Sequence, residues 1–283
     1  MNIVGLGKAG CKIAEQFSQY SQYTVFKIDS DEKLKRKKNC VFIAKQSNAE
    51  LYDANPVDLR KLIKNLDEDE EMYFALCGSG SVSACSLWIL KQLKEAGQKI
   101  NIIYIKPELG TLDNQSKLRN RAHFHILQEY TRSGVFEKIF LFDNAMVSEI
   151  IGKTSLLNYF NKINEFIVTS IHWYNIYNNS ETVYDTYRGE YVSSRICAFS
   201  YVDVESQKEK KVFSIENTNQ IKYFYGINRI TIEEDETLLD RLTEISLTED
   251  NSSKSISHGV YPTDLEIGYS LAVHSSSDIQ EQD

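Results

Sequence analysis

Two loops rich in glycine and serine could hold a phosphate chain. The first runs from Gly5 to Gly10 and the second from Cys77 to Ser81. Each follows an apolar run typical of a strand and precedes the apolar spacing of a helix. Small residues let backbone amides approach a ligand closely, and the following helix directs its positive N-terminus at the same place. One such loop could be an ordinary turn, but a pair indicates phosphate binding.

The elements that must position these loops alternate between strands and helices. Apolar runs predict strands at 1–4, 24–29, 71–77, 100–106 and 138–142. Helical spacing follows the first loop, Asn55-Pro56 and the second loop, and a long polar helix is predicted over 114–132. This alternation predicts an α/β fold with a Rossmann-like, mostly parallel sheet covered by helices on both faces. Both loops then fall on the carboxyl edge of the sheet, where folds of this class bind ligands.

The second half of the chain has a different character. A long amphipathic helix is predicted over 158–177, followed by segments rich in aromatic and β-branched residues and by a helix over 233–245. A polar loop is expected at 246–257 and a last strand at 268–273. The predicted organisation is a nucleotide-binding domain, a connecting helix, a small α+β domain and a disordered tail, at 1–157, 158–178, 179–274 and 275–283.

Composition excludes several classes of protein. The 283 residues carry a formal net charge of −8, which argues against a general nucleic-acid binder. The five cysteines are widely spaced without a C-x-x-C motif, so they predict reduced thiols and no metal site. No apolar run reaches transmembrane length, and the N-terminus has no signal-peptide pattern. We therefore expect a cytoplasmic protein without membrane insertion.

The order of these motifs resembles the tubulin/FtsZ superfamily over nearly the whole chain. The Gly5–Gly10 loop looks like the first phosphate loop of that family, and Cys77–Ser81 falls at its glycine-rich signature. Four further segments fit in sequence order: Ala54-Asn55-Pro56, Lys106-Pro107, Asp143-Asn144, and the strand, turn and helix of 226–245. Residues 259–273 resemble the closing hairpin of the FtsZ C-terminal domain.

The resemblance implies a set of ligand-binding residues. The expected phosphate contacts are Gly5, Gly7, Lys8, Gly10, Cys11, Ala54, Asn55, Gly78, Ser79, Gly80 and Ser81. The expected ribose and base contacts are Asn114, Asn144, Phe160 and Asn164.

Elementary chemistry supports parts of this set. Phe160 and Asn164 lie one helical turn apart and offer the flat apolar face and the amide edge that a purine requires. The alternative places Phe160 in the core and Asn164 on the helix surface. Lys8 could neutralise phosphate charge or simply face solvent. Mg²⁺ would be held mainly by phosphate oxygens and water.

The implied function is that of a guanine-nucleotide-binding protein with GTP or GDP at the interface between subunits. Such a chain assembles with itself head to tail, since a heterologous contact that does not close produces a filament. In FtsZ an Asn-x-Asp-x-x-Asp run after the central helix completes the neighbour's active site. The matching region here offers only Glu181 and Asp185, which are tentative catalytic residues or members of a polar loop.

Two other interpretations remain open. Leu76, Cys77 and Val82 replace glycines of the family signature, and each added Cβ crowds the place where phosphate must approach. The chain could therefore be a structural protein of this fold that binds nucleotide weakly or not at all. It could also be an NAD-dependent Rossmann enzyme, because Asp29 follows Gly10 by 19 residues, at the position that binds the ribose. No convincing catalytic His, Lys or Tyr supports this reading. Adaptors and cargo are not predicted.

Overall fold

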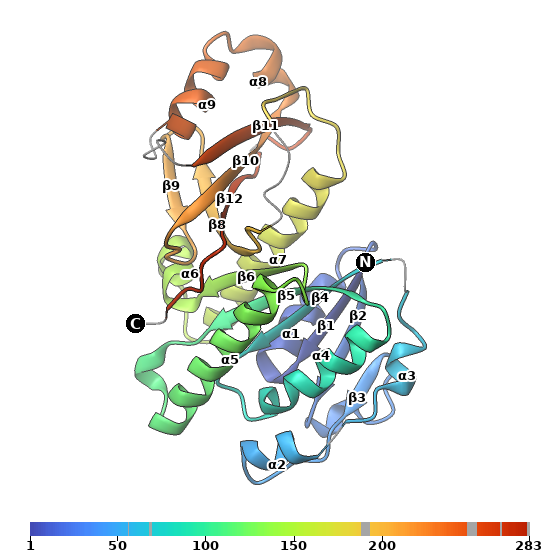
Figure 1. The fold of residues 1–283 in the computed structure, drawn as a ribbon. Helices are drawn as coiled ribbons and strands as arrows, with labels where there is room; N and C mark the ends of the chain where they lie inside the picture. Colours follow the sequence, from blue (N-terminus) through green and yellow to red (C-terminus); the bar gives the residue numbers. More distant parts are fainter. Residues whose placement is uncertain (56, 68–69, 188–192, 248–253, 267, 282–283) are drawn as a thin grey trace. The chain divides into compact units, whose positions relative to one another are not determined.

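The computed structural model describes residues 1–55, 57–67, 70–187, 193–247, 254–266 and 268–281 (Figure 1). They form two compact units. Unit 1 comprises the described residues of Met1–Val168 together with Glu281, and unit 2 comprises those of Thr169–Gln280. None of the described helices combines the length and the apolar character needed to cross a lipid bilayer.

Unit 1 is built on a parallel sheet with the strand order β3-β2-β1-β4-β5-β6. The strands are β1 (Asn2–Leu6), β2 (Thr24–Asp29), β3 (Cys40–Phe42), β4 (Glu71–Cys77), β5 (Lys99–Lys106) and β6 (Lys138–Asp143). In β4 and β5 the residues at 72–76 and 100–105 are buried without interruption. Both faces of the sheet are therefore covered, which explains why these strands read as continuous apolar runs.

The helices of unit 1 follow the strands. They are α1 (Gly7–Phe17), α2 (Ala49–Ala54), α3 (Arg60–Ile63), α4 (Ser86–Glu95), α5 (Asn114–Arg132) and α6 (Asn144–Ile151), with 3-10 turns η1 (Glu32–Leu34), η2 (Val82–Cys85) and η3 (Leu109–Thr111). Asp113 and Asp143 cap α5 and α6, because each side chain accepts a hydrogen bond from a first-turn amide. The predicted α/β class is confirmed.

Helix α7 (Tyr159–Asn178) leads into unit 2. There the strand order is β8-β12-β10-β11-β7, with β9 paired to β8. The strands are β7 (Tyr184–Asp185), β8 (Ile196–Asp203), β9 (Lys208–Lys211), β10 (Thr218–Asn228), β11 (Ser255–Thr263) and β12 (Ser270–Ser276). Strand β10 pairs parallel with β11, and the remaining pairs are antiparallel.

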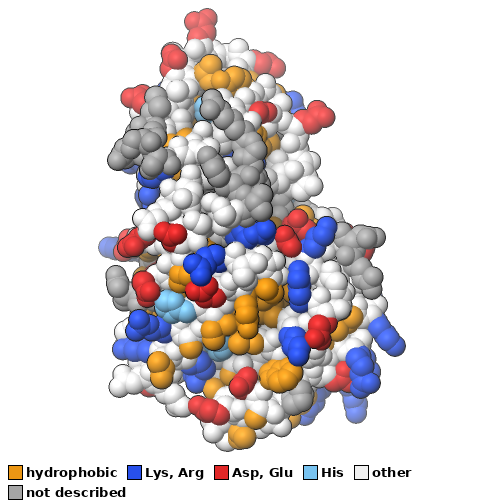
Figure 2. All heavy atoms as spheres, in the orientation of Figure 1, with side chains coloured by type: hydrophobic (Ala, Val, Ile, Leu, Met, Phe, Trp, Pro, Cys, Tyr) orange, Lys and Arg blue, Asp and Glu red, His pale blue; other side chains and the backbone are white. Residues whose placement is uncertain are grey.

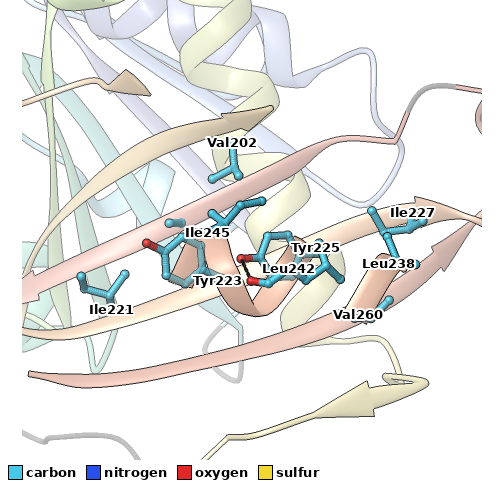
Figure 3. Close-up of a cluster of buried hydrophobic side chains, with 10 residues drawn as sticks. Val202, Ile221, Tyr223, Tyr225, Ile227, Leu238, Leu242, Ile245 and Val260 are labelled. Atoms are coloured by element: carbon cyan, nitrogen blue, oxygen red, sulfur yellow. Dashed lines mark hydrogen bonds between the residues drawn. The ribbon is translucent and has the colours of Figure 1, made fainter. Parts of the chain in front are cut away.

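Two helices, α8 (Arg229–Glu234) and α9 (Leu238–Leu247), connect β10 to β11. The apolar side of α9 packs on the sheet, where Leu242 lies beside Tyr223 and Tyr225 (Figure 3). The buried Tyr225 hydroxyl donates to the backbone oxygen of Leu242 at 3.1 Å, so this large side chain enters the core without an unsatisfied polar group.

The outer strand β9 turns one charged side chain inward. Glu209 accepts a hydrogen bond from the Tyr223 hydroxyl at 3.0 Å, and its other oxygen lies 2.5 Å from Nε2 of the buried His274. The other three residues of the strand are lysines.

Four local expectations differ from the structure. Asn55 does not start a helix: it follows α2, and its amide donates to the backbone oxygen of Leu51, while Pro56 lies outside the described residues. The polar loop ends earlier than expected, because β11 begins at Ser255. Segment 259–273 is no hairpin, since β10 lies between β11 and β12. The expected tail begins inside β12, and Gln280 is only 2% exposed.

Candidate functional site

The first loop joins β1 to α1 through three glycines with different tasks. A Cβ on Gly5 would lie 2.3 Å from the Gly10 oxygen, and one on Gly10 would lie 2.1 Å from the Ala75 oxygen. These two glycines therefore let α1 pack directly on β1 and β4. Gly7 adopts a φ of +68°, which a residue with a side chain rarely tolerates. It turns the chain from strand to helix at the carboxyl edge.

Lys8 and Cys11 follow on α1 in contrasting surroundings. The Lys8 side chain is exposed. Cys11 is buried, and its thiol lies 3.3 Å from the Gly5 oxygen and 3.5 Å from the Ile28 oxygen. Burial, together with the negative charge of Asp29, raises the pKa of Cys11 to about 12. The thiol is thus a neutral group that fills the space between β1 and β2.

The second loop lies beside the first. The Cβ position of Gly7 is 3.7 Å from the Val82 Cβ and 3.9 Å from the Ser83 Oγ. Gly10 also reaches the strand that precedes the second loop, through its contact with Ala75. The structure therefore brings together two loops that lie far apart in the sequence, because β1 and β4 are neighbouring strands.

Side chains hold the second loop through its carbonyl groups. Three oxygens accept hydrogen bonds: Cys77 O from Ser83 Oγ (2.7 Å), Gly78 O from His123 Nδ1 (3.0 Å) and Ser79 O from Arg119 Nη2 (3.1 Å). Within the described part of the chain, the backbone amides of Ser81 and Val82 donate to no protein acceptor. The backbone carbonyl groups of this loop are thus bonded to protein side chains, whereas unpaired backbone amides remain at the start of η2. Unpaired amides suit an anionic ligand.

Gly78 is fixed by close contact with α5 and β5. A Cβ there would lie 2.1 Å from the Tyr104 hydroxyl and 2.7 Å from the Asn120 Oδ1. The Tyr104 hydroxyl itself donates to Asn120 Oδ1 at 2.8 Å. Glycine is therefore required at this position for packing.

Acidification is expected to weaken this support. Burial lowers the pKa of His123 from its ordinary value of 6.5, so the unfolded chain binds the proton more strongly than the folded chain. The free energy of unfolding should then fall as the pH drops below about 6.5. Urea unfolding at pH 7 and pH 5 measures this loss, which should be smaller in His123→Gln. An equal loss in both proteins would contradict the assignment to His123.

Polar groups also gather where β5 and β6 end. Lys106 and Asp143 form an ion pair at 3.0 Å with side chains 17% and 13% exposed. The Tyr159 hydroxyl donates to Glu108, which ties the first turn of α7 to the segment after β5. Asn144 is 9% exposed, and its Oδ1 is buried without a hydrogen-bond partner among the described residues. An unpaired buried oxygen is costly, so a ligand donor would stabilise it.

The predicted base contacts lie on the same helix but differ in exposure. Phe160 is 62% exposed, so it is not a core residue, and its ring meets Tyr159 edge to face. Asn164 is half-buried. Gln16 of α1 donates to the Asn161 oxygen at 3.2 Å, which fixes this first part of α7 against unit 1.

The remaining predicted contacts stand around the second loop. Ala54 and Asn55 are exposed at the end of α2, which packs against η2. Asn114 is the exposed first residue of α5. The next residue, Gln115, donates to Glu50 of α2 at 2.8 Å, so α2 and the start of α5 are neighbours.

The two tentative catalytic carboxylates belong to unit 2. Both are exposed. Asp185 in β7 accepts from the Thr182 hydroxyl at 2.6 Å and from the Tyr187 amide at 3.3 Å. Glu181 makes no hydrogen bond or ion pair with any described residue. Of the two, Glu181 is therefore the carboxylate that is available to another molecule.

Sequence reasoning missed the residues of α5 that support the second loop. Arg119, Asn120 and His123 come from a helix whose composition is mostly polar. A usable signal was present, because the buried residues Asn120, His123, Phe124, Leu127 and Thr131 recur at three- and four-residue spacing. This inward face is partly polar, and a buried polar stripe needs partners on the loops beneath it.

A separate apolar groove of about 440 Å³ lies along α4 and the end of α5. Its lining includes Leu87, Trp88, Tyr130 and Phe136, and hydrophobic side chains gather on this face of unit 1 in Figure 2. None of the predicted ligand contacts lines this groove. It is therefore distinct from the site at the carboxyl edge.

The fold is that of a doubly wound α/β unit with two adjacent glycine-containing loops at the carboxyl edge of its sheet, and a long helix connects it to a smaller α+β unit. No protein-family model matches the sequence, and no curated protein sequence matches it significantly. Solved structures do match, and they show the fold.

The chain has the fold of the tubulin/FtsZ superfamily, as predicted. It is similar to an empty FtsZ dimer from M. jannaschii, with a TM-score of 0.69 and 13% identity over 97% of this chain and 87% of that one. A GTPγS-form TubZ protofilament from Bacillus thuringiensis gives 0.71 and 15% over 97% and 86%. A GTPγS-bound CetZ2 protofilament from Haloferax volcanii gives 0.73 and 16% over 96% and 92%.

Proposed function

We propose that this chain binds a guanine nucleotide at the carboxyl edge of unit 1 and assembles head to tail into cytoplasmic filaments. One observation carries the nucleotide site: Gly7, with its positive φ, lies beside Val82 and Ser83. This contact joins two loops that each end in a helix N-terminus, and such a pair can hold a polyphosphate.

The residues present fit such a ligand. The free amides of Ser81 and Val82 suit phosphate oxygens, and the unpaired Oδ1 of Asn144 suits a donor on the sugar or base. The exposed ring of Phe160 offers a stacking face for guanine. The described residues contain no group of three or more His, Cys, Asp or Glu that could hold a metal. Mg²⁺ would therefore be held mainly by phosphate and water.

Exposed apolar side chains support self-association. Leu156 and Leu157 are each 90% exposed in the loop between α6 and α7 of unit 1. Unit 2 also carries exposed apolar side chains, among them Val183 (56%), Ile230 (62%) and Leu265 (47%). We propose that the unit 1 set of one copy contacts the unit 2 set of the next, which is a heterologous, non-closing contact. The same contact would place Glu181 beside the nucleotide of the neighbouring copy. Any GTPase activity would then depend on assembly.

Sedimentation and calorimetry test the two parts separately. Purified protein should bind GTP and GDP in isothermal titration, and GTP with Mg²⁺ should make it pellet and form filaments visible by electron microscopy. Nucleotide binding without pelleting would contradict the proposed assembly and leave the proposed nucleotide site standing. No binding and no pelleting would remove both.

A second candidate keeps the fold but lacks the nucleotide. The observation that favours it is the side chain of Val82, which is 9% exposed and packs where Gly7 approaches. The Cys77 thiol also occupies the loop, 3.4 Å from the Ser79 hydroxyl. If calorimetric titration with GTP and with GDP gives no binding heat, this second candidate, a structural protein without nucleotide, is favoured. Calorimetry with NADH would test the Rossmann enzyme, whose strand order 3-2-1-4-5-6 unit 1 shares.

A further inference from the structure

A segment of positive charge borders the sheet of unit 1. This basic segment, residues 33–38, runs from η1 toward β3, the outermost strand of that sheet. Several of its side chains are exposed and form no ion pair or hydrogen bond with any residue that the structure describes: Lys33, Arg36, Lys37 and Lys38. Figure 2 shows positively charged side chains at the border of unit 1 where Figure 1 places β3 and α3. The formal net charge of the chain is −8, so this segment is opposite in sign to the chain as a whole.

The basic segment has a defined conformation. Leu34 is 7% exposed and anchors the segment in the core. Lys35 is paired with Glu32 at 2.7 Å, and its Nζ lies 4.5 Å from the centre of the Phe42 ring. Arg36 has a φ of +64°, which residues with a side chain rarely adopt. The unpaired cations are therefore presented from an ordered loop, which lowers the entropic cost of binding a partner.

Unit 2 carries a surface of the opposite charge. Exposed carboxylates recur at four-residue spacing in α9 and just before it, at Glu236, Asp240 and Glu244. Residues four apart on a helix are neighbours, so these carboxylates form an acidic row. The buried side of α9 packs on the sheet of unit 2, so the row stands on the outer side of the helix. Among the described residues, Glu236 and Asp240 form no ion pair or hydrogen bond, and Glu244 accepts only from the neutral Gln207 amide at 3.2 Å.

We propose that the basic segment of one copy of this chain binds the acidic row of another copy, in addition to the head-to-tail contact. Two copies repel each other through their formal net charge of −8, so charge favours the orientation in which these two surfaces meet. The basic segment precedes the outermost strand β3, whereas the two glycine-containing loops follow the inner strands β1 and β4. The contact therefore lies at the flank of unit 1 and does not depend on the proposed nucleotide site.

Sedimentation velocity of the nucleotide-free protein tests this contact. The measurement is made in about 0.1 M and about 1 M KCl, which screen charges beyond roughly 10 Å and 3 Å. Association at the lower salt concentration should weaken by about tenfold or more at the higher one. Lys37→Glu with Lys38→Glu reverses charge in the basic segment, and Glu236→Lys with Asp240→Lys reverses it in the acidic row. Each double variant should associate about tenfold more weakly or less, since one exposed ion pair is worth up to about fivefold and repulsion replaces it.

A mixture of the two double variants is the decisive measurement. The acidic row is intact in the first variant and the basic segment is intact in the second, so mixing should restore association to within about threefold of wild type. Restoration also shows that both variants are folded. Lys99→Glu with Lys117→Glu is the matched control for net charge, because both lysines are exposed in unit 1 outside the basic segment. This control should associate as wild type does.

Each of the other outcomes overturns the inference. Equal association of wild type and both double variants does so, as does wild-type association that is absent at the lower salt concentration or unchanged at the higher one. A mixture that fails to associate also contradicts the contact between copies. If the reversed basic segment leaves self-association unchanged but abolishes binding of a short DNA duplex, the segment binds nucleic acid instead. None of these measurements includes a nucleotide, so a failure here is distinct from a failure of the proposed function.

Discussion

Gly10→Ala is expected to destabilise unit 1 by about 3 kcal/mol or more, or to prevent its folding. The new Cβ would lie 2.1 Å from the backbone oxygen of Ala75, in the middle of the sheet. A flexible side chain could move aside, but a backbone oxygen in a central strand cannot. Helix α1 would have to lift from β1 and β4, and the burial of Ile13, Ala14 and Phe17 would be lost with it.

Thermal unfolding followed by circular dichroism measures this effect. The midpoint should fall by about 10 °C if the variant folds. Gly110→Ala is the matched control, because a Cβ there meets nothing within 4 Å and the residue has no positive φ. A Gly10→Ala protein as stable as that control would show that α1 does not pack as described.

The second large effect concerns assembly. Replacing Leu156 and Leu157 together by glutamate should abolish pelleting and leave the fold intact, because both side chains are 90% exposed and support no core. Burying one leucine at a contact is worth about 1.5–3 kcal/mol, so losing two should raise the critical concentration by a hundredfold or more. Light scattering and sedimentation over a concentration series give this quantity.

Nucleotide binding separates the possible causes. The double variant should bind GDP as tightly as wild type, since neither leucine is a predicted ligand contact. Ile126→Glu, on α5 with 37% exposure, is the control for adding a charge to an exposed aliphatic position. Normal assembly by the double variant would locate the contact elsewhere, and a loss of assembly in Ile126→Glu would make charge alone the explanation.

Strand positions and the carboxyl-edge loops could be predicted because their signals are local. Buried parallel strands read as apolar runs, and a glycine such as Gly7 marks a turn that other residues cannot make. The sequence placed both loops at the carboxyl edge of the sheet, but their contact depends on the pairing of β1 with β4, which only the structure gives. The local signal at Asn55 was misleading. Its residue type predicts the start of a helix, but in the structure Asn55 lies at the end of α2.

The tertiary contacts between distant segments could not be predicted from the sequence. Nothing near Gly78 indicates that His123 and Asn120 will reach it from α5, some 45 residues away. The order of β10, β11 and β12 also depends on a crossover through α8 and α9 rather than on a turn. Gln280 reads as part of a polar tail, yet its side chain bonds the amide of Glu216 and is buried.

Strand β9 limits how copies of this chain can join. A free sheet edge invites another strand, and proteins prevent this with lysines and with inward-pointing charges. This edge carries both, since its three lysines flank Glu209, which is committed to His274 and Tyr223. An incoming strand would meet a row of positive charge. Addition of another strand to the sheet at β9 is therefore disfavoured, so this edge protects the chain against joining its copies by sheet extension there.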